Sequence, residues 1–176
     1  QQNVFGSGHA LSLGINTSRI NRTYSIAFTE PYWTVDGVSR TLEAYHRRLD
    51  PTSLSVSQYT SETNGAAVGF GVPITETDTI NLGLRFDRTT LELFQDSPPV
   101  YIDFVDEFGS TTNALVLSAG WSRDTRDDIL YPNQGRLQSL FVEVGLPPGD
   151  LSYYKAQYLH QWFWPVWTPF VLMLRA

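Results

Sequence analysis

The stretch Thr79-Ile-Asn-Leu-Gly-Leu-Arg-Phe-Asp87 decides the fold, because its side chains alternate between two kinds at every residue. One set is apolar and the other is small or polar. The apolar set consists of Ile80, Leu82, Leu84 and Phe86. The other set consists of Asn81, Gly83, Arg85 and Asp87. A period of two residues is the signature of a β-strand with one apolar face. The stretch therefore predicts a strand that separates two different environments.

The same alternation recurs along the whole chain. It is clear from Thr23, from Gly65 and from Asn113, and weaker in five further segments. Those segments are 8–16, 38–48, 136–145, 153–163 and 170–175. Each segment is near the ~10 residues that a tilted strand needs to cross a membrane. No segment has a convincing helical period, so we predict an all-β chain of about nine strands.

Composition restricts the class of protein. Hydrophobic residues make up 41% and charged residues 17% of the 176 residues, and mean hydropathy is -0.20. These values exclude a helical membrane protein but are compatible with a β-barrel, in which polar and apolar faces cancel in any average. The chain has no cysteine, which excludes a disulfide scaffold. A net charge of -6 argues against a nucleic-acid partner.

The two faces of the strands predict their surroundings. We expect the apolar face to meet membrane lipid. Its predicted members are Tyr24, Ile26, Phe28, Val68, Phe70, Ile80, Leu82, Leu84, Phe86, Leu115 and Leu117. The other face is rich in Gly, Ala and Ser and carries Arg47, Arg85 and Asp87, which favours a polar lumen. An arginine at the bilayer midplane on the lipid face would cost about 2–4 kcal/mol.

Aromatic residues gather near the strand ends, where a membrane–water boundary would place Trp and Tyr. They are Tyr32, Trp33, Trp121, Tyr131, Trp162, Phe163, Trp164 and Trp167. A soluble β-sandwich with these aromatics in its core is the alternative.

The connections between the predicted strands also alternate between two kinds. We assign 16–21, 50–56, 94–111 and 146–151 to the cell exterior, and 30–37, 73–78, 124–135 and 165–169 to the periplasm.

Two turn motifs carry more information than the alternation. The first is Phe28-Thr-Glu-Pro-Tyr-Trp-Thr-Val-Asp-Gly-Val-Ser39, and the second is Trp121-Ser-Arg-Asp-Thr-Arg-Asp-Asp-Ile-Leu-Tyr-Pro-Asn-Gln-Gly135. Pro ends a strand and Asp-Gly forms a tight turn. The predicted periplasmic turn residues are Pro31, Asp36, Gly37, Asp124, Arg126, Asp127, Pro132 and Gly135. Both motifs resemble turns in the barrel of the BamA superfamily, and the resemblance extends over essentially the whole chain.

The resemblance implies an antiparallel transmembrane β-barrel of sixteen strands in a Gram-negative outer membrane. Residues 1–176 would be part of that one barrel domain, with periplasmic domains before them and further strands after them. No signal peptide opens the chain, so we expect its natural start to lie upstream. The implied function is insertion and folding of other barrel proteins. A two-partner secretion transporter and a passive porin are the alternatives.

The implied partners are outer-membrane lipids, unfolded outer-membrane protein clients and assembly-machinery lipoproteins. We expect no enzyme activity, cofactor or metal. His9, His46 and His160 lie in separate segments, without ligand spacing. Asp124, Asp127 and Asp128 lack a calcium-loop pattern. Our interpretation is that these aspartates hold their turn through hydrogen bonds with Arg123 and Arg126.

Overall fold

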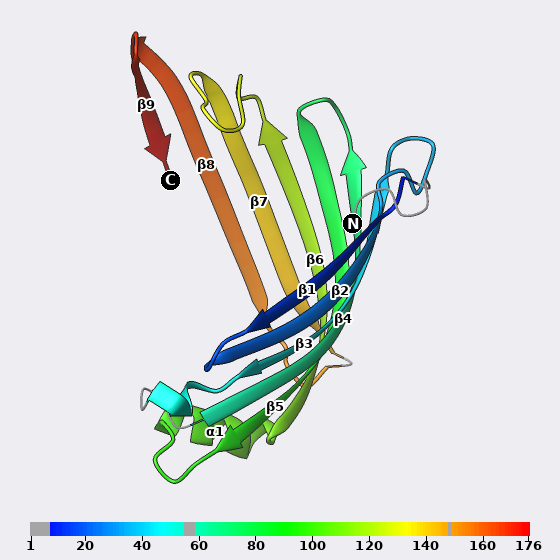
Figure 1. Ribbon diagram of the computed structural model, residues 1–176, viewed down its shortest axis with the longest axis vertical. Coiled ribbons are helices and arrows are strands. Elements are labelled where there is room, and N and C mark those ends of the chain that lie inside the picture. Colours follow the sequence, from blue (N-terminus) through cyan, green and yellow to red (C-terminus); the bar gives the residue numbers. More distant parts are fainter. Residues whose placement is uncertain (1–7, 55–58, 148) are drawn as a thin grey trace.

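A computed structural model describes residues 8–54, 59–147 and 149–176. These residues form a single nine-stranded sheet in which each strand pairs antiparallel with the next in sequence, an uninterrupted meander (Figure 1). The strands are β1 (Ala10–Thr17), β2 (Asn21–Glu30), β3 (Ser39–Leu49), β4 (Tyr59–Pro73), β5 (Asp78–Leu93), β6 (Thr111–Asp124), β7 (Gly135–Leu146), β8 (Tyr154–Trp167) and β9 (Phe170–Arg175). The nine predicted strands are therefore confirmed.

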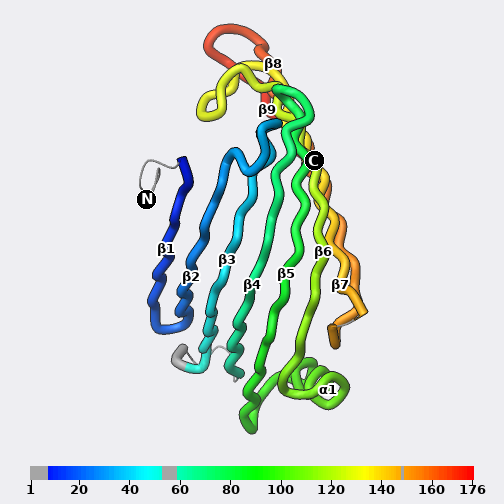
Figure 2. Tube along the Cα trace, turned by 90° about the vertical axis from the view of Figure 1, so that its right-hand side faces the viewer, coloured from blue at the N-terminus to red at the C-terminus, as the bar shows by residue number. Residues whose placement is uncertain are grey.

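The sheet is curved and twisted, with its strands running side by side (Figure 2). The sheet is open, because β1 and β9 do not pair with each other among the described residues. No second sheet packs on it within the described part of the chain, so the β-sandwich alternative is wrong. Buried apolar side chains are few: Ala114, Val116 and Phe163. All three lie on the concave face.

Register assigns every residue to a face, because directly opposed residues on neighbouring strands point to the same side. One continuous row, for example, consists of Leu13, Ile26, Ala44, Ala66, Phe86 and Leu115. It crosses six strands on the convex face. The alternation read from single strands thus becomes one continuous apolar surface.

Connections gather at two ends of the sheet. We call one end the turn rim; it carries the connections 31–38, 74–77, 125–134 and 168–169. The other end is the loop rim, with the connections from β1 to β2, β3 to β4, β5 to β6 and β7 to β8. The sets agree with the two groups of connections predicted from the sequence.

Two predictions about local structure are wrong. The connection between β5 and β6 contains a helix, α1 (Pro99–Phe108), at the loop rim (Figure 1). Proline at its start and Gly109, with φ of 85°, just after its end are the local signals that the sequence offered. α1 is too short to cross a bilayer, and the described residues contain no other α-helix. A 3₁₀ turn (Pro51–Leu54) follows β3.

Strand length is the second difference. β4, β5, β6 and β8 have 14 to 16 residues, more than the ~10 that a bilayer requires. The extra residues of β4 and β5 lie toward the loop rim, where Thr60, Glu62, Thr90 and Glu92 replace the apolar set. These strands extend beyond their apolar band because hydrogen bonding with a neighbour does not require apolar side chains.

Candidate functional site

The convex face brings together all eleven residues predicted to face lipid. Phe28 lies in one row with Leu42, Val68, Leu84 and Leu117. In the neighbouring rows, Phe70 is opposite Leu82, and Ile80 is opposite Trp121. Tyr24, Ile26, Leu82, Leu84, Phe86 and Leu117 are all between 40% and 48% exposed. An apolar surface this continuous requires an apolar environment.

The concave face carries a polar network that joins β3, β5 and β7. Tyr45 donates a hydrogen bond to Asp87, and Arg85 Nε lies 2.9 Å from Asp87 Oδ2. The Arg85 guanidinium also lies 4.0 Å from Glu143, which accepts a 3.2 Å hydrogen bond from Tyr153. The prediction that Arg85 and Asp87 share the inner face agrees with this arrangement.

Gly65 makes the network possible. It lies on β4 between Tyr45 and Asp87, and a Cβ at this position would come within 2.3 Å of the Tyr45 ring. Only glycine lets the tyrosine pass across the strand to reach the carboxylate. Arg47, also predicted to face the lumen, places its guanidinium 5.8 Å from the centre of the Tyr45 ring.

A concavity of about 380 Å³ lies on this face. Its lining includes Thr41, Glu43, Tyr45, Arg47, Arg85 and Ser118. The sequence predicted the polar character of this surface. It did not identify Tyr45, Glu143 or Tyr153 as members of a network, because their partners lie outside their own strand segments.

The turn after β2 is closed by its own backbone. Trp33 N–H donates to Val38 O at 2.8 Å, and Gly37 N–H donates to Thr34 O at 3.1 Å. Gly37 has φ of 83°, a conformation that glycine adopts at no steric cost. Pro31 and Asp36 lie in this turn, as predicted.

Outward-facing side chains support the same turn. Arg40 pairs with Glu30 through a 2.6 Å bond from Nε, and its guanidinium lies 5.3 Å from the Trp33 ring centre. The Trp33 ring also contacts Phe70, with ring centres 5.3 Å apart. Trp33 thereby joins the turn to the convex face.

The turn after β6 is held by its aspartates. Arg126 donates to both oxygens of Asp124, at 2.9 and 2.7 Å. Asp127 accepts the backbone N–H groups of Asn133 and Gln134 at 2.9 and 3.1 Å. Asp128 accepts those of Leu130 and Tyr131 at 2.7 and 2.8 Å. Pro132 lies half-buried within this turn.

These hydrogen bonds affect protonation. The backbone N–H groups of Gln134 and Asn133 hold the pKa of Asp127 below its usual value. Gly135, with φ of 109°, ends the turn against the backbone of Thr125. The interpretation that the aspartates hold this turn with Arg126 agrees with the geometry.

The prediction that Arg123 bonds the aspartates of this turn is wrong. The Arg123 guanidinium donates to Asp78 on the neighbouring strand, at 2.8 and 3.0 Å. Asp78 also accepts from Trp121 Nε1 at 3.1 Å and is 6% exposed. The register explains the difference, since β5 and β6 place Asp78 directly opposite Arg123.

The predicted aromatic belt lies along the turn rim, with one exception. Tyr32, Trp33 and Tyr131 are in the turns, and Trp164 and Trp167 are near the end of β8. Trp162 lies against the Arg136 guanidinium, which is 4.9 Å from its ring centre. Phe163 instead faces the concave side and is 9% exposed, because neighbouring residues of a strand alternate in direction.

The described residues contain no group of three His, Asp or Glu side chains able to hold a metal ion. His46 bonds Asn64 at 2.9 Å on the convex face, whereas His160 lies near Tyr158 on β8. The features that the geometry brings together are therefore surfaces: an apolar convex face, a polar concave face and two different rims.

Comparison with known proteins reveals consistent similarities. The Omp85 superfamily domain matches residues 3–176. The outer membrane protein assembly factor BamA of Neisseria meningitidis serogroup B is 35% identical over 184 residues, covering 99% of this chain and 23% of the relative. BamA of Nitratidesulfovibrio vulgaris is 26% identical over 157 residues, which cover 88% of this chain and 19% of the relative. The chain thus spans less than a quarter of these relatives.

A solved structure has the same fold. The crystal structure of BamA from Haemophilus ducreyi lacking POTRA domains 1-3 superposes with a TM-score of 0.83. The match covers 96% of this chain and 34% of that chain, at 23% sequence identity. At this identity the likeness establishes the architecture of the strands.

Proposed function

This chain belongs to the Omp85 superfamily, and on this premise we propose that it forms a wall of an insertase. The chain is a run of strands from an outer-membrane β-barrel, and the insertase would fold and insert other barrel proteins. The observation that carries the proposal is the curved nine-stranded meander with an apolar convex face and a polar concave face. Two relatives with this region are named as outer membrane protein assembly factors.

The proposed mechanism follows from the cost of unpaired backbone groups in hydrocarbon. Each such group costs several kcal/mol, so a client strand needs a pairing partner while it enters the bilayer. A barrel that opens at a seam offers its edge strand as that partner. Local thinning of the bilayer lowers the barrier further. This process uses no catalytic residue, cofactor or metal.

The strands described here act as the stable wall in this mechanism. The network of Tyr45, Asp87, Arg85 and Glu143 braces β3, β5 and β7 from the inside. A braced wall keeps the barrel intact while the seam moves. We propose that its clients are unfolded outer-membrane proteins and that it works with assembly-machinery lipoproteins.

The direct experiment reconstitutes the full-length protein containing this chain in liposomes and measures the folding rate of a client barrel protein. We expect faster client folding than in protein-free liposomes. A passive porin would leave that rate unchanged and show a stable ion-selective conductance instead. Passage of one large polypeptide through the lumen, without folding of barrel clients, would identify a secretion transporter.

A pair of neighbouring substitutions tests the assignment of faces. Leu82→Arg places a charge on the convex face and should cost about 2–4 kcal/mol of barrel stability, and assembly should fall with it. Asn81→Arg places the same side chain on the concave face, between Gly71 and Gly120, and should be tolerated. Equal effects of the two substitutions would contradict the assignment of lipid and lumen faces.

We further propose that the turn rim faces the periplasm and contacts periplasmic domains. Its turns expose several large apolar side chains, including Val35, Ile129, Leu130 and Tyr131. Replacing Leu130 and Tyr131 together by serine should reduce assembly activity without changing barrel stability. Unchanged assembly would count against a docking role for this turn.

A further inference from the structure

The convex face contains a furrow that runs along β3 and β4. Its floor is the directly opposed pair Ala44 and Ala66, and its sides are Ile26 on β2 and Phe86 on β5. Toward the turn rim the next row is filled by Phe28, Leu42, Val68 and Leu84. The volume of the furrow is about 670 Å³ and its lining is almost wholly apolar. The furrow therefore exists because the floor residues are small and the side chains beside them are large.

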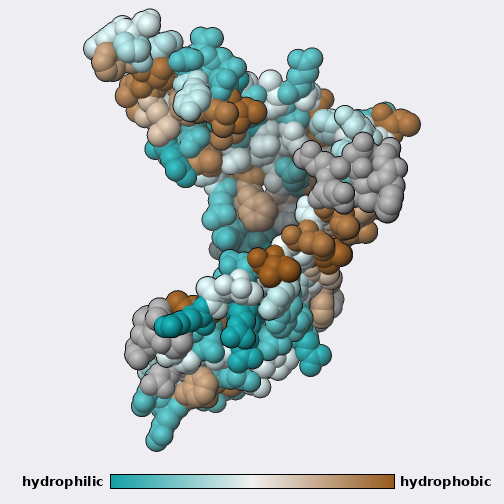
Figure 3. All heavy atoms as spheres, viewed as in Figure 1, coloured by the Kyte–Doolittle hydropathy of each residue, from teal (hydrophilic) through white to brown (hydrophobic). Residues whose placement is uncertain are grey.

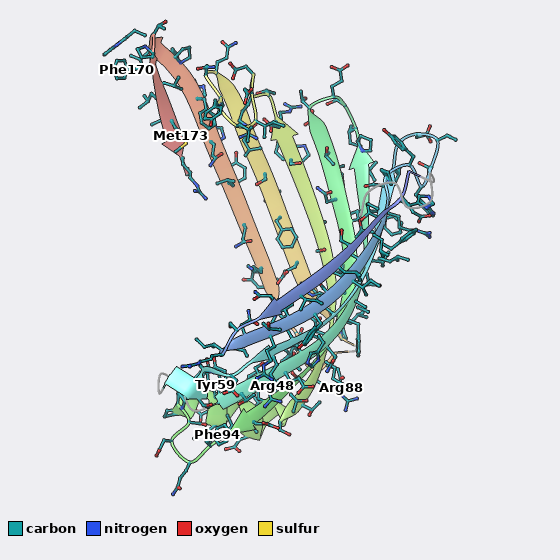
Figure 4. All side chains as sticks on the ribbon, in the orientation of Figure 1. Arg48, Tyr59, Arg88, Phe94, Phe170 and Met173 are labelled. Carbon is teal, nitrogen blue, oxygen red and sulfur yellow. The ribbon has the colours of Figure 1, made fainter. Side chains whose placement is uncertain are left out.

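Polar side chains close the furrow at its end nearest the loop rim. The next row there is Tyr24, His46, Asn64 and Arg88, and the one beyond is Arg22, Arg48, Glu62 and Thr90. Figure 4 labels Arg48 and Arg88 on the part of the sheet toward α1. Hydrophobic side chains follow β1 across the middle of the molecule in Figure 3. Apolar and cationic surfaces thus adjoin along the strands.

The arginines of these two rows are weakly neutralised. Arg48 lies 3.9 Å from Glu62, and both side chains are more than 40% exposed. Arg22 and Arg88 are exposed and form no ion pair or hydrogen bond with any described residue. Among other nearby acids, Asp50 follows β3, accepts a hydrogen bond from Thr52 and lines a small pocket with Arg22 and Arg48. Glu92 lies one row farther from the furrow, and Asp150 is bound to Asn113. Glu62 is therefore the only acidic side chain within the two rows.

We propose that this site binds one anionic lipid, with an acyl chain in the furrow and a phosphate of its headgroup on Arg48 and Arg88. β3 and β5 flank β4 and so lie two strand spacings, about 9.6 Å, apart, and Arg48 is one row farther from the furrow than Arg88. Two long arginine side chains can converge on one phosphate above β4 from these positions. Arginine suits phosphate because its planar guanidinium can donate two parallel hydrogen bonds. A free phosphate ion would leave the furrow unused, which favours a lipid.

The test uses the full-length protein in mixed micelles containing phosphatidylglycerol and phosphatidylcholine with identical acyl chains. Native mass spectrometry counts the lipids that remain bound. We expect phosphatidylglycerol to be retained preferentially, and the double variant Arg48→Gln, Arg88→Gln to lower its apparent affinity at least about tenfold. Arg47→Gln is the matched control, because it removes the same charge from the opposite face of β3 and should change nothing.

A second pair of variants tests the furrow itself. Ala66→Leu fills the floor and should reduce lipid retention, whereas Ala119→Leu adds the same volume elsewhere on the convex face and should not. Unchanged retention in Ala66→Leu would overturn the proposal. Equal retention of the two lipids, an equal effect of Arg47→Gln, or displacement of the lipid by inorganic phosphate would each overturn it as well. None of these measurements depends on client folding.

Discussion

Outward-facing arginines at the two rims of the sheet differ in their ion-pair and hydrogen-bond partners. At the turn rim, Arg40 is paired with Glu30, and Arg123 with Asp78. At the loop rim, Arg88 has no hydrogen-bond or ion-pair partner among the described residues, and Arg48 has a single ion pair of 3.9 Å. Arg40 and Arg123 at the turn rim are thus paired within the protein, whereas Arg48 and Arg88 at the loop rim are available to an external anion.

This difference follows from the register of the strands. At the turn rim, strand pairing places Glu30 opposite Arg40 and Asp78 opposite Arg123. The strands at the loop rim extend past the apolar band, which places arginines on an exposed sheet surface. A rim with internally satisfied charges is expected to be rigid, and its substitutions should affect stability most.

The largest effect should come from Gly135→Ala. A Cβ there would lie 2.3 Å from Thr125 O, and φ is 109°, so both the contact and the backbone conformation oppose the change. We expect a loss of more than about 2 kcal/mol. The temperature at which the full-length barrel loses its compact mobility on electrophoresis measures it.

Gly37→Ala is the matched control for that substitution. Gly37 also has positive φ, but its Cβ would meet only Pro73, at 3.6 Å. The substitution should reduce stability by about 1–2 kcal/mol, because only the positive φ opposes an alanine at this position. A cost for Gly37→Ala equal to that for Gly135→Ala would show that contact with the Thr125 backbone has no importance.

Asp78→Ala should have the next largest effect. It removes the acceptor of Arg123 and Trp121 and leaves the arginine unpaired on the convex face. We expect the same electrophoretic transition to fall by several degrees. Glu62→Ala at the loop rim breaks only an exposed pair, which contributes about 0.2–1 kcal/mol at most. Equal shifts for the two variants would contradict the contrast between the rims.

A smaller, pH-dependent effect is expected for Asp127→Asn. The pKa of Asp127 is lowered in the folded protein, so its carboxylate contributes stability above the unfolded pKa of about 3.9. That contribution is lost as the pH falls through the lowered pKa. Wild type should therefore exceed the variant in thermal stability at pH 7, with the gap closing in strong acid. A gap independent of pH would show that the ionised form has no special role.

The smallest effect should be that of Arg88→Gln on stability. Arg88 is exposed and without a partner in the described part of the chain, so the change should stay within about 0.5 kcal/mol. The same variant should weaken lipid binding, which separates the two properties at the loop rim. A large loss of stability would show that Arg88 has a structural partner.

Local sequence was sufficient for several features. Alternation at Ile80, Leu82 and Leu84 assigned the faces of β5, because a strand has a period of two whatever it pairs with. The turn motifs likewise predicted the positions of Gly37 and Gly135. α1 was missed because the prediction relied on apolar alternation and gave no weight to the Pro and Gly residues at the ends of the helix.

Partnerships across strands were decided by the tertiary structure alone. Tyr45 and Asp87 are 42 residues apart, and Asp78 and Arg123 are 45 apart. The furrow likewise exists because β3 and β4 place Ala44 opposite Ala66. Alternation tells which side of a strand a residue occupies, but the register of the hydrogen-bonded ladder decides which residue it meets. The sequence by itself determined the strands, the faces and the turns, whereas the assembled sheet decided the networks and the furrow.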